Sequence, residues 1–174
     1  PLSTGGAFGD ACTQYRAAVA KQLEGKHFDA IFTAALSTTP YAAGEHASSY
    51  DAAVAGYREA WATQTSQGTP VITVVDNPVW ETDPNKCLRT RAQSACDGAR
   101  SDLLTEKDPL REAAAGQRDV TLLDFTKVFC DDETCRAVVG GANIYRDQDH
   151  ITVTFANSLA PQYTAALKAA MGIG

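Results

Sequence analysis

A histidine and an aspartate near the C-terminal end of the chain have the spacing of a proton-transfer pair. Asp147 and His150 lie in the segment "YRDQDHITVTF", just before a run of residues with helical periodicity. On a turn, this spacing places both side chains on the same side, so that the carboxylate can accept the proton on the imidazole Nδ1 atom. The Nε2 atom is then free to act as a general base toward a hydroxyl group. The spacing therefore fits half of a site for nucleophilic catalysis.

The same spacing also fits an ordinary surface loop. In this interpretation Asp147 and Asp149 are solvated carboxylates, and His150 caps the helix that follows. Spacing alone favours the surface loop, because Asp-x-x-His often arises by chance. The position in the chain favours a site, because the loop follows the third predicted strand and its hairpin. In open α/β sheets, sites gather at the carboxyl ends of the strands.

The elements that must position this pair alternate between strands and helices. Three apolar segments are predicted to be buried strands: 27–36, 69–78 and 119–126. The clearest helix carries Tyr50, Val54, Tyr57 and Trp61 at helical spacing. The predicted helices are 10–24 with Asp10 as N-cap, 47–64, about 88–104, 106–117 and about 153–171. With a short hairpin from "RAVVGG" to "NIYR", this order predicts an α/β fold with a doubly wound parallel sheet.

The composition is that of one globular domain. The chain has 174 residues, of which 44% are apolar and 21% charged, so that it can bury a core and does not resemble a disordered segment. The net charge of −6 and the lack of a Lys or Arg run argue against nucleic-acid binding. No apolar stretch approaches the roughly 18 residues of a membrane span, and the N-terminal residues lack signal-peptide features. We expect any export signal or membrane anchor to lie outside this sequence.

Four of the five cysteines form two close pairs in the sequence. Cys87 and Cys96 bracket a short polar loop, and Cys130 and Cys135 bracket "DDET". These spacings suit two local disulfides in an oxidising compartment. The alternative is a four-cysteine zinc site, but the spacing fits the common zinc knuckles poorly. Cys12 is left over, which indicates a missing partner.

The segment around the Asp–His pair resembles a known block. "IYRDQDHITVTFANSLAPQY" is similar to the closing block of SGNH (GDSL-type) hydrolases. It resembles more closely the SGNH domain at the C-terminus of acyltransferase-family-3 membrane proteins, in which Tyr-x-Asp-x-x-His-Leu-Thr is typical and Ile151 here replaces the leucine. Further segments resemble that family in the same order along nearly the whole chain: Cys12 and its helix with Tyr15 in place of the commoner Trp, "HFDAIFTAAL", "VVDNPVWETDPNKC" followed by Cys96, and "FCDDETCRAVVGGANIYRD".

The resemblance implies an SGNH-hydrolase-like sheet of the flavodoxin-like three-layer type, with a Ser-His-Asp triad. Asp147 and His150 would be two members of that triad. The Gly-Asp-Ser-His block that carries the family's serine does not occur in this sequence. "FGDAC", residues 8–12, imitates it with Ala11 in the serine position, but we expect this segment to be the linker before the first helix.

The other serines are poor candidates for the nucleophile. Ser37, Ser48 and Ser49 lack the context of a nucleophile elbow, and no Gly-x-Asn-Asp follows the strand at 27–36 to supply the family's oxyanion donors. In a sheet of order 2-1-3-4-5, the three predicted strands would be the family's third, fourth and fifth. We therefore expect residues 1–174 to be the C-terminal portion of a single SGNH domain whose first two strands, and whose serine, lie upstream.

Two further features agree with an upstream segment. Without the first two strands, the third strand of the sheet would expose an apolar edge, which native proteins avoid. In relatives, a Cys-Pro pair follows the second strand, and its cysteine bonds to the counterpart of Cys12. The sequence begins with Pro1, as if it started one residue after that cysteine. We expect Cys12 to form a disulfide with this upstream segment.

The resemblance implies the extracytoplasmic SGNH domain of a bacterial O-acyltransferase, membrane-anchored through its parent protein. Such a domain transfers an acetyl or short acyl group to a hydroxyl of a cell-envelope glycan through a serine ester. His150 would be the general base and then the general acid, and Asp147 would orient it. The expected partners are the glycan, the upstream segment and the membrane acyltransferase domain. No cofactor or metal ion is expected.

Two alternatives stay open. A carbohydrate esterase would differ only in using water instead of a sugar hydroxyl as the acceptor. A non-catalytic SGNH-like module would bind a glycan or a partner without a nucleophile, and Trp80 and Tyr41 could stack on sugars, although Trp80 also fits a core position. His27 and His46 have no partner pattern and are interpreted as structural or solvated residues.

Overall fold

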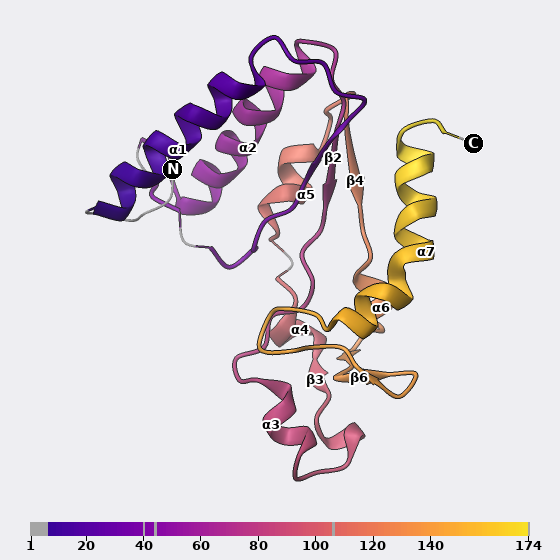
Figure 1. Cartoon of the computed structure of the whole chain (residues 1–174). Coiled ribbons are helices and arrows are strands. Elements are labelled where there is room, and N and C mark those ends of the chain that lie inside the picture. Colours follow the sequence, from indigo (N-terminus) through magenta and orange to yellow (C-terminus); the bar gives the residue numbers. More distant parts are fainter. Residues whose placement is uncertain (1–6, 40, 44, 106, 174) are drawn as a thin grey trace. The chain divides into compact units, whose positions relative to one another are not determined.

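A computed structural model describes residues 7–39, 41–43, 45–105 and 107–173 of the chain (Figure 1). The chain divides into two compact units. Unit 1 comprises Pro1–Thr73 and Pro109–Leu122, and unit 2 comprises Val74–Asp108 and Leu123–Gly174. Pro1 lies outside the described residues, and so does the expectation that it follows the cysteine of a Cys-Pro pair.

The main sheet has three strands in the order β1-β2-β4. The strands are β1 (Ile31–Thr33), β2 (Val71–Val74) and β4 (Val120–Leu123), and β1 runs parallel to β2. The N–H groups of Val71 and Val75 donate to the carbonyl groups of Asp119 and Leu123, each at 2.9 Å. These bonds step forward along both strands, as in parallel pairing. The prediction of an α/β fold with a parallel sheet is confirmed.

The burial of the strands follows their order in the sheet. The central strand β2 is buried along its whole length, as predicted. β1 is much shorter than the predicted strand at 27–36 and is not buried on both faces, because Phe32 is 49% exposed. The physical reason is that β1 has a neighbour on one side only within the described sheet. β4 is only partly buried, with Thr121 exposed, so the prediction of a fully buried third strand is also corrected.

The long helix of unit 1 that the sequence predicted most clearly is α2 (Ser49–Thr65). Its N-cap is Ser48, whose hydroxyl oxygen accepts the N–H of Asp51 at 3.1 Å. In its apolar stripe Val54 and Trp61 are buried, and they form a core with residues of α5 (Pro109–Ala114) and of the sheet. The predicted stripe is therefore the buried face of the helix.

The first helix begins earlier than predicted. α1 extends over Ala7–Leu23 and lies alongside α2 (Figure 1). Asp10 therefore lies in the first turn, where a carboxylate interacts favourably with the helix dipole, and is not the N-cap. The expectation that residues 8–12 form a linker is wrong for the same reason. Tyr15 is 71% exposed, and Cys12 is a partly exposed free cysteine.

Unit 2 is built from short elements and one long helix. Antiparallel pairing joins β3 to β5 and β6 to β7. The β6–β7 pair is the predicted hairpin, and it turns at Gly140 and Gly141, which have φ values of 59° and 79° that favour glycine. The elements are α3 (Pro84–Leu88), β3 (Gly98–Ala99), α4 (Arg100–Leu103), α6 (Thr126–Phe129), β5 (Thr134–Cys135), β6 (Val138–Val139), β7 (Ala142–Asn143) and α7 (Val153–Ala170), with a 3-10 turn at Gln93–Ala95.

The helix α3 differs from the sequence prediction. The prediction placed a helix from about residue 88 onward, whereas α3 ends at Leu88. Asp83 is its N-cap and Pro84 lies at its first position, a pair of residues that favours a helix start. None of the helices in the described part of the chain has the length and apolar character that a membrane span requires.

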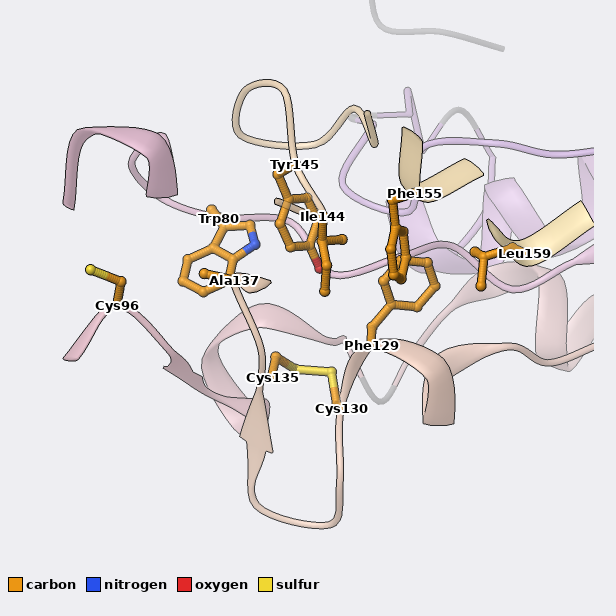
Figure 2. Close-up of a cluster of buried hydrophobic side chains, with 10 residues drawn as sticks. All are labelled: Trp80, Cys96, Phe129, Cys130, Cys135, Ala137, Ile144, Tyr145, Phe155 and Leu159. Atoms are coloured by element: carbon orange, nitrogen blue, oxygen red, sulfur yellow. A yellow bond between two sulfur atoms is a disulfide. The ribbon is translucent and has the colours of Figure 1, made fainter. Parts of the chain in front are cut away.

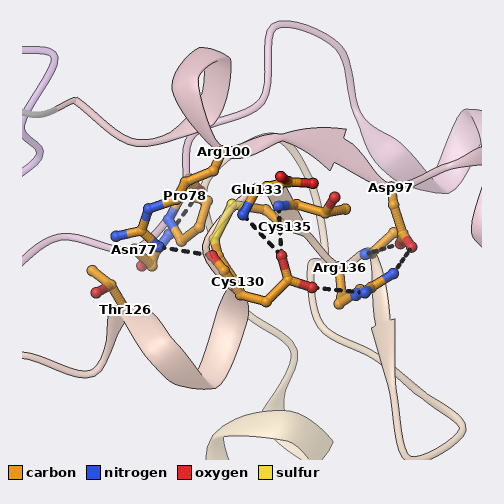
Figure 3. Close-up of a disulfide and its surroundings, with 12 residues drawn as sticks. Asn77, Pro78, Asp97, Arg100, Thr126, Cys130, Glu133, Cys135 and Arg136 are labelled. Atoms are coloured by element: carbon orange, nitrogen blue, oxygen red, sulfur yellow. Dashed lines mark hydrogen bonds and ion pairs between the residues drawn. A yellow bond between two sulfur atoms is a disulfide. The ribbon is translucent and has the colours of Figure 1, made fainter.

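Both predicted disulfides are present, Cys87–Cys96 and Cys130–Cys135. The cysteines are therefore not ligands of the zinc site that was the alternative. Figure 3 shows the surroundings of the second disulfide, where the Arg136 guanidinium contacts the Asp97 carboxylate at 2.9 Å. This contact joins the two disulfide-bearing segments of unit 2.

The core of unit 2 is aromatic (Figure 2). The ring of Tyr145 packs edge-on against Trp80, with ring centroids 5.4 Å apart, and also lies near Phe129. Phe129 in turn contacts Phe155 of α7, at 5.7 Å between centroids. Tyr145 is only 1% exposed, and burial raises the pKa of its hydroxyl. The core thus fixes the chain two residues before Asp147.

Candidate active site

The loop between β7 and α7 brings Asp147 and His150 together. The Nδ1 atom of His150 lies 3.0 Å from Oδ1 and 3.1 Å from Oδ2 of Asp147. When Nδ1 carries the proton, it donates to the carboxylate, and Nε2 has a free lone pair. The side chains are 64% and 40% exposed, so that Nε2 can reach a group outside the loop. This is the geometry that the spacing predicted.

The backbone of the loop explains why the two side chains meet. Oδ1 of Asp147 accepts the N–H of His150 at 2.8 Å and the N–H of Asp149 at 3.2 Å, as aspartates in tight turns do. The N–H of Arg146 donates to the carbonyl group of His150 at 2.8 Å and closes the loop. Asp147 therefore folds the turn with its carboxylate and contacts the imidazole with the same group.

These hydrogen bonds also set the charge of the site. The backbone N–H of His150 lowers the pKa of Asp147 most, and the Asp149 N–H and the His150 side chain lower it further, so that it lies far below its usual range. Asp147 is then ionised at any physiological pH. An ionised carboxylate can hold the imidazole tautomer and stabilise an imidazolium, whereas it does not take up the proton itself.

A second carboxylate lies near the same imidazole atom. Oδ1 of Asp149 is 3.1 Å from Nδ1 of His150, although in the surface-loop interpretation Asp149 is only a solvated residue. One ligand atom from each of Asp147, Asp149 and His150 lies within 4.8 Å of the others. These three residues are the group in the described ranges that could hold a metal ion, and exposed acidic groups often have this arrangement without one.

The cap of α7 is Thr152 and not His150. The Thr152 hydroxyl oxygen accepts the N–H of Phe155 at 3.2 Å and donates its proton to the carbonyl group of Asn143 at 2.7 Å. The interpretation in which His150 caps the helix is therefore wrong. A threonine two residues later already satisfies the first turn of α7, which leaves the imidazole free for other contacts.

Hydrogen bonds that the sequence did not predict hold the backbone of the loop. The side-chain amide of Asn77 donates a hydrogen bond to the carbonyl group of Asp149, and that of Asn85 donates to the carbonyl group of Tyr145. The backbone N–H of Trp80 donates to the carbonyl group of Gln148. In the sequence, Asn77 is only one of the last residues of the predicted strand at 69–78. Nothing in the local pattern indicates which distant carbonyl groups these amides reach.

Among the described residues of unit 2, no serine contacts the pair. No hydroxyl group of the described part of unit 2 forms a hydrogen bond with His150. Ser48 is the N-cap of α2, Ser49 is its first residue, and Ala11 lies inside α1. The position of the nucleophile therefore stays a prediction.

The other candidate residues have structural surroundings. Trp80 is 9% exposed and belongs to the core, so it offers no stacking surface for a sugar. Tyr41 is partly buried, and its hydroxyl contacts that of Tyr57. His27 and His46 are exposed, in agreement with their interpretation as solvated residues.

Comparison with known families identifies the type of domain. A family model described as an SGNH domain fused to AT3 domains matches residues 1–165. The chain belongs to this SGNH family. No curated protein and no solved structure is significantly similar to it. The suspected resemblance is thus confirmed, and the description associates SGNH domains of this kind with acyltransferase (AT3) domains on the same polypeptide.

Proposed function

We propose that this SGNH domain is the extracytoplasmic part of a bacterial O-acyltransferase that transfers an acetyl or short acyl group to a hydroxyl of a cell-envelope glycan. The observation that carries the proposal is the contact between His150 and Asp147 on a backbone-fixed loop, in a chain of a family fused to acyltransferase domains. The two disulfides support an oxidising, extracytoplasmic location.

The chemistry follows from the free Nε2 atom of His150. A serine hydroxyl gives its proton to Nε2 while its oxygen attacks the acyl carbonyl carbon, and Asp147 stabilises the imidazolium that forms. The imidazolium then returns the proton to the leaving group, and a serine ester remains. In the second half, the glycan hydroxyl attacks the ester, His150 takes its proton, and the serine oxygen receives that proton as it leaves. Acyl transfer through a serine ester requires no metal ion or cofactor.

The serine of this mechanism would belong to a segment upstream of the chain. Such a segment would add the first two strands of a doubly wound, three-layer sheet, one of them beside β1. The exposed side chains of Phe28, Phe32 and Leu36, on and around β1, support this, because they leave apolar surface uncovered. Cys12 would form a disulfide with the same segment, and its free, partly exposed state is compatible with that role.

The direct test is acyl transfer by the intact parent protein. We expect His150→Ala to lower the rate by at least about 10³-fold and Asp147→Asn by roughly 10²- to 10⁴-fold, because general base and orienting residue act as a unit. His46→Ala, which changes an exposed histidine of unit 1, is the matched control and should retain the wild-type rate.

Wild-type activity in His150→Ala would contradict the proposal and favour a module that only binds a glycan or a partner. The acceptor distinguishes the transferase from the esterase. The transferase forms an acylated glycan in proportion to the added glycan, whereas the esterase releases the free acid at the same rate with or without it.

A further inference from the structure

The segment that follows β2 binds the backbone of the Asp147–His150 loop. We call residues 77–85 the cradle segment. At one end, the side-chain amide of Asn77 donates to the carbonyl group of Asp149 at 2.9 Å. In the middle, the N–H of Trp80 donates to the carbonyl group of Gln148 at 2.8 Å. These bonds fix the loop on the side of His150.

The other end of the cradle segment fixes the loop before Asp147. The Nδ2 atom of Asn85 donates to the carbonyl groups of Tyr145 at 3.0 Å and Arg146 at 3.1 Å. Asn85 itself lies in α3, which the Cys87–Cys96 disulfide constrains. The cradle segment therefore holds four carbonyl groups of the loop, two on each side of Asp147.

The two asparagine side chains are themselves held in place. The backbone of Asn77 is restricted because this residue closely follows the buried strand β2. Its side chain is restricted because its Nδ2 atom also donates to the carbonyl group of Pro78 at 3.1 Å. The Nδ2 atom of Asn85 also donates to Oδ1 of Asp83 at 2.8 Å, and its Oδ1 atom accepts from Asn143 at 3.2 Å. Donors that are fixed by their own contacts can fix a partner accurately.

The loop depends on such donors because side-chain packing cannot position its functional groups. The side chains of Asp147 and His150 are 40% and 64% exposed, so that few neighbours restrict them. A misplacement of about 1 Å can lower the rate of a positioned reaction by roughly 10²-fold. The backbone bonds from the cradle segment therefore add to the restraint that the hydrogen bonds within the turn place on the pair.

We propose that Asn77 and Asn85 are positioning residues for the Asp147–His150 pair, acting through the loop backbone and not on the reacting atoms. The expected effect of these residues on the rate of acyl transfer rests on the proposed function. Their expected effect on the stability of the loop hydrogen bonds does not. Two measurements separate these parts. The first follows the exchange of loop amides and the second follows acyl transfer, both in the intact parent protein.

The sharpest variant is Asn77→Asp, which keeps the shape of the side chain and removes its N–H donors. Asn157→Asp, at an exposed position of α7, makes the same change of chemistry and charge and is the control. We expect Asn77→Asp to accelerate hydrogen exchange of the Asp149 and His150 amides at least about tenfold. Asn85→Ala should accelerate exchange of the Arg146 amide by a similar factor.

The amides of Ile144 and Thr152 report on the rest of unit 2. Their N–H groups donate to the carbonyl groups of Ala137 at 3.0 Å and Ile144 at 2.7 Å, outside the cradle contacts. We expect their exchange to stay unchanged in Asn77→Asp. Unchanged exchange at His150, or equal acceleration at all of these amides, would overturn the proposal, because Asn77 would then have no effect on the loop or only a general effect on stability.

In the intact protein, we expect Asn77→Asp to lower kcat for acyl transfer about 10- to 100-fold with little change in KM, and Asn157→Asp to have no effect. If Asn77→Asp retains the wild-type kcat while His150→Ala is inactive, the positioning proposal is wrong and the proposed function stands. If His150→Ala is itself fully active, the proposed function is wrong, and amide exchange still decides whether Asn77 positions the loop.

Discussion

The Asp147 carboxylate combines two tasks that are usually divided between residues. It accepts two backbone N–H groups, which shape the turn, and it contacts the imidazole of His150, whose tautomer it would set. The first task lowers its pKa and thereby secures the charge that the second task needs. The turn and the pair are therefore one local structure.

We expect the contribution of this charge to stability to depend on pH. Because the pKa of Asp147 in the folded protein lies below its ordinary value of 3.8, the ionised carboxylate stabilises the folded state fully above that value. The contribution is lost as the pH falls from the ordinary value toward the folded-state pKa. Urea unfolding of wild type and Asp147→Asn should show a free-energy difference that is constant above about pH 5 and narrows below about pH 4.

The asparagine in this variant still offers an acceptor to the backbone N–H groups, so that the comparison isolates the charge. Asp132→Asn, at an exposed position, is a suitable control and should differ little from wild type. A difference between wild type and Asp147→Asn that stays constant down to about pH 3 would show that the folded protein does not hold this pKa low.

At the scale of residues, the sequence predicted the Asp147–His150 pair but not the contacts that hold it in place. Asp147 and His150 are three residues apart, and local turn geometry suffices to bring them together. Asn77 and the carbonyl group of Asp149 are separated by 72 residues, and their contact depends on how two segments pack. The role of Asp149 itself was missed because its contact with the imidazole depends on the detailed course of the turn.

At the scale of elements, unit 2 is held together by polar contacts between its short segments. The Asp97 carboxylate, next to Cys96, accepts the N–H of Ala137 at 3.0 Å and contacts Arg136 at 2.9 Å. The acids Asp97 and Asp131 raise the pKa of the Arg136 guanidinium, which keeps it charged. The Asp97 carboxylate thus accepts a hydrogen bond from the N–H group of a buried residue and also forms an exposed ion pair.

We expect these two roles of Asp97 to differ in free energy. Asp97→Ala leaves the N–H of Ala137, a residue that is 1% exposed, without its acceptor and should lower the free energy of unfolding by about 1–3 kcal/mol. Asp97→Asn keeps an acceptor and loses only the ion pair with the half-exposed Arg136, which should lower the free energy of unfolding much less than Asp97→Ala does. Urea unfolding measures both variants, and equal losses in the two would contradict the assignment.

The elements that the sequence predicted well are those with strong local signals. The helix α2 has a cap and a regular apolar stripe, and the β6–β7 hairpin has two glycines at its turn. The strand at 27–36 was predicted too long, because an apolar run alone does not show which residues have a neighbour to pair with. The start of α3 was missed although Asp83 and Pro84 form a helix-start signal, since the predicted helix began only at about residue 88.

At the scale of the whole molecule, the family could be predicted because its segments occur in order along the entire chain. The family match over residues 1–165 confirms this. The acceptor and the acyl group of the proposed transfer could not be predicted, because their recognition would depend on surfaces outside the Asp–His loop. The upstream position of the nucleophile was predicted by elimination, because Ser37, Ser48 and Ser49 lack the context of a nucleophile elbow.

The outer edge of β1 is the structural feature that most supports an upstream position of the serine. β1 is the outer strand of the described sheet, and Phe32 on it is 49% exposed. An added strand beside β1 would satisfy its open backbone groups and cover apolar surface. It would also carry a serine at the carboxyl end of the sheet, where sites of open α/β sheets gather.

The most direct measurement is to label the intact parent protein with a fluorophosphonate, which reacts with activated serines, and to identify the modified residue by mass spectrometry. We predict one modified serine, located before Pro1, and labelling at least about 100-fold slower in His150→Ala than in wild type. His46→Ala should label at the wild-type rate. Modification of a serine within residues 1–174, or equal labelling rates in wild type and His150→Ala, would contradict the proposal that His150 and Asp147 activate a serine supplied from outside this chain.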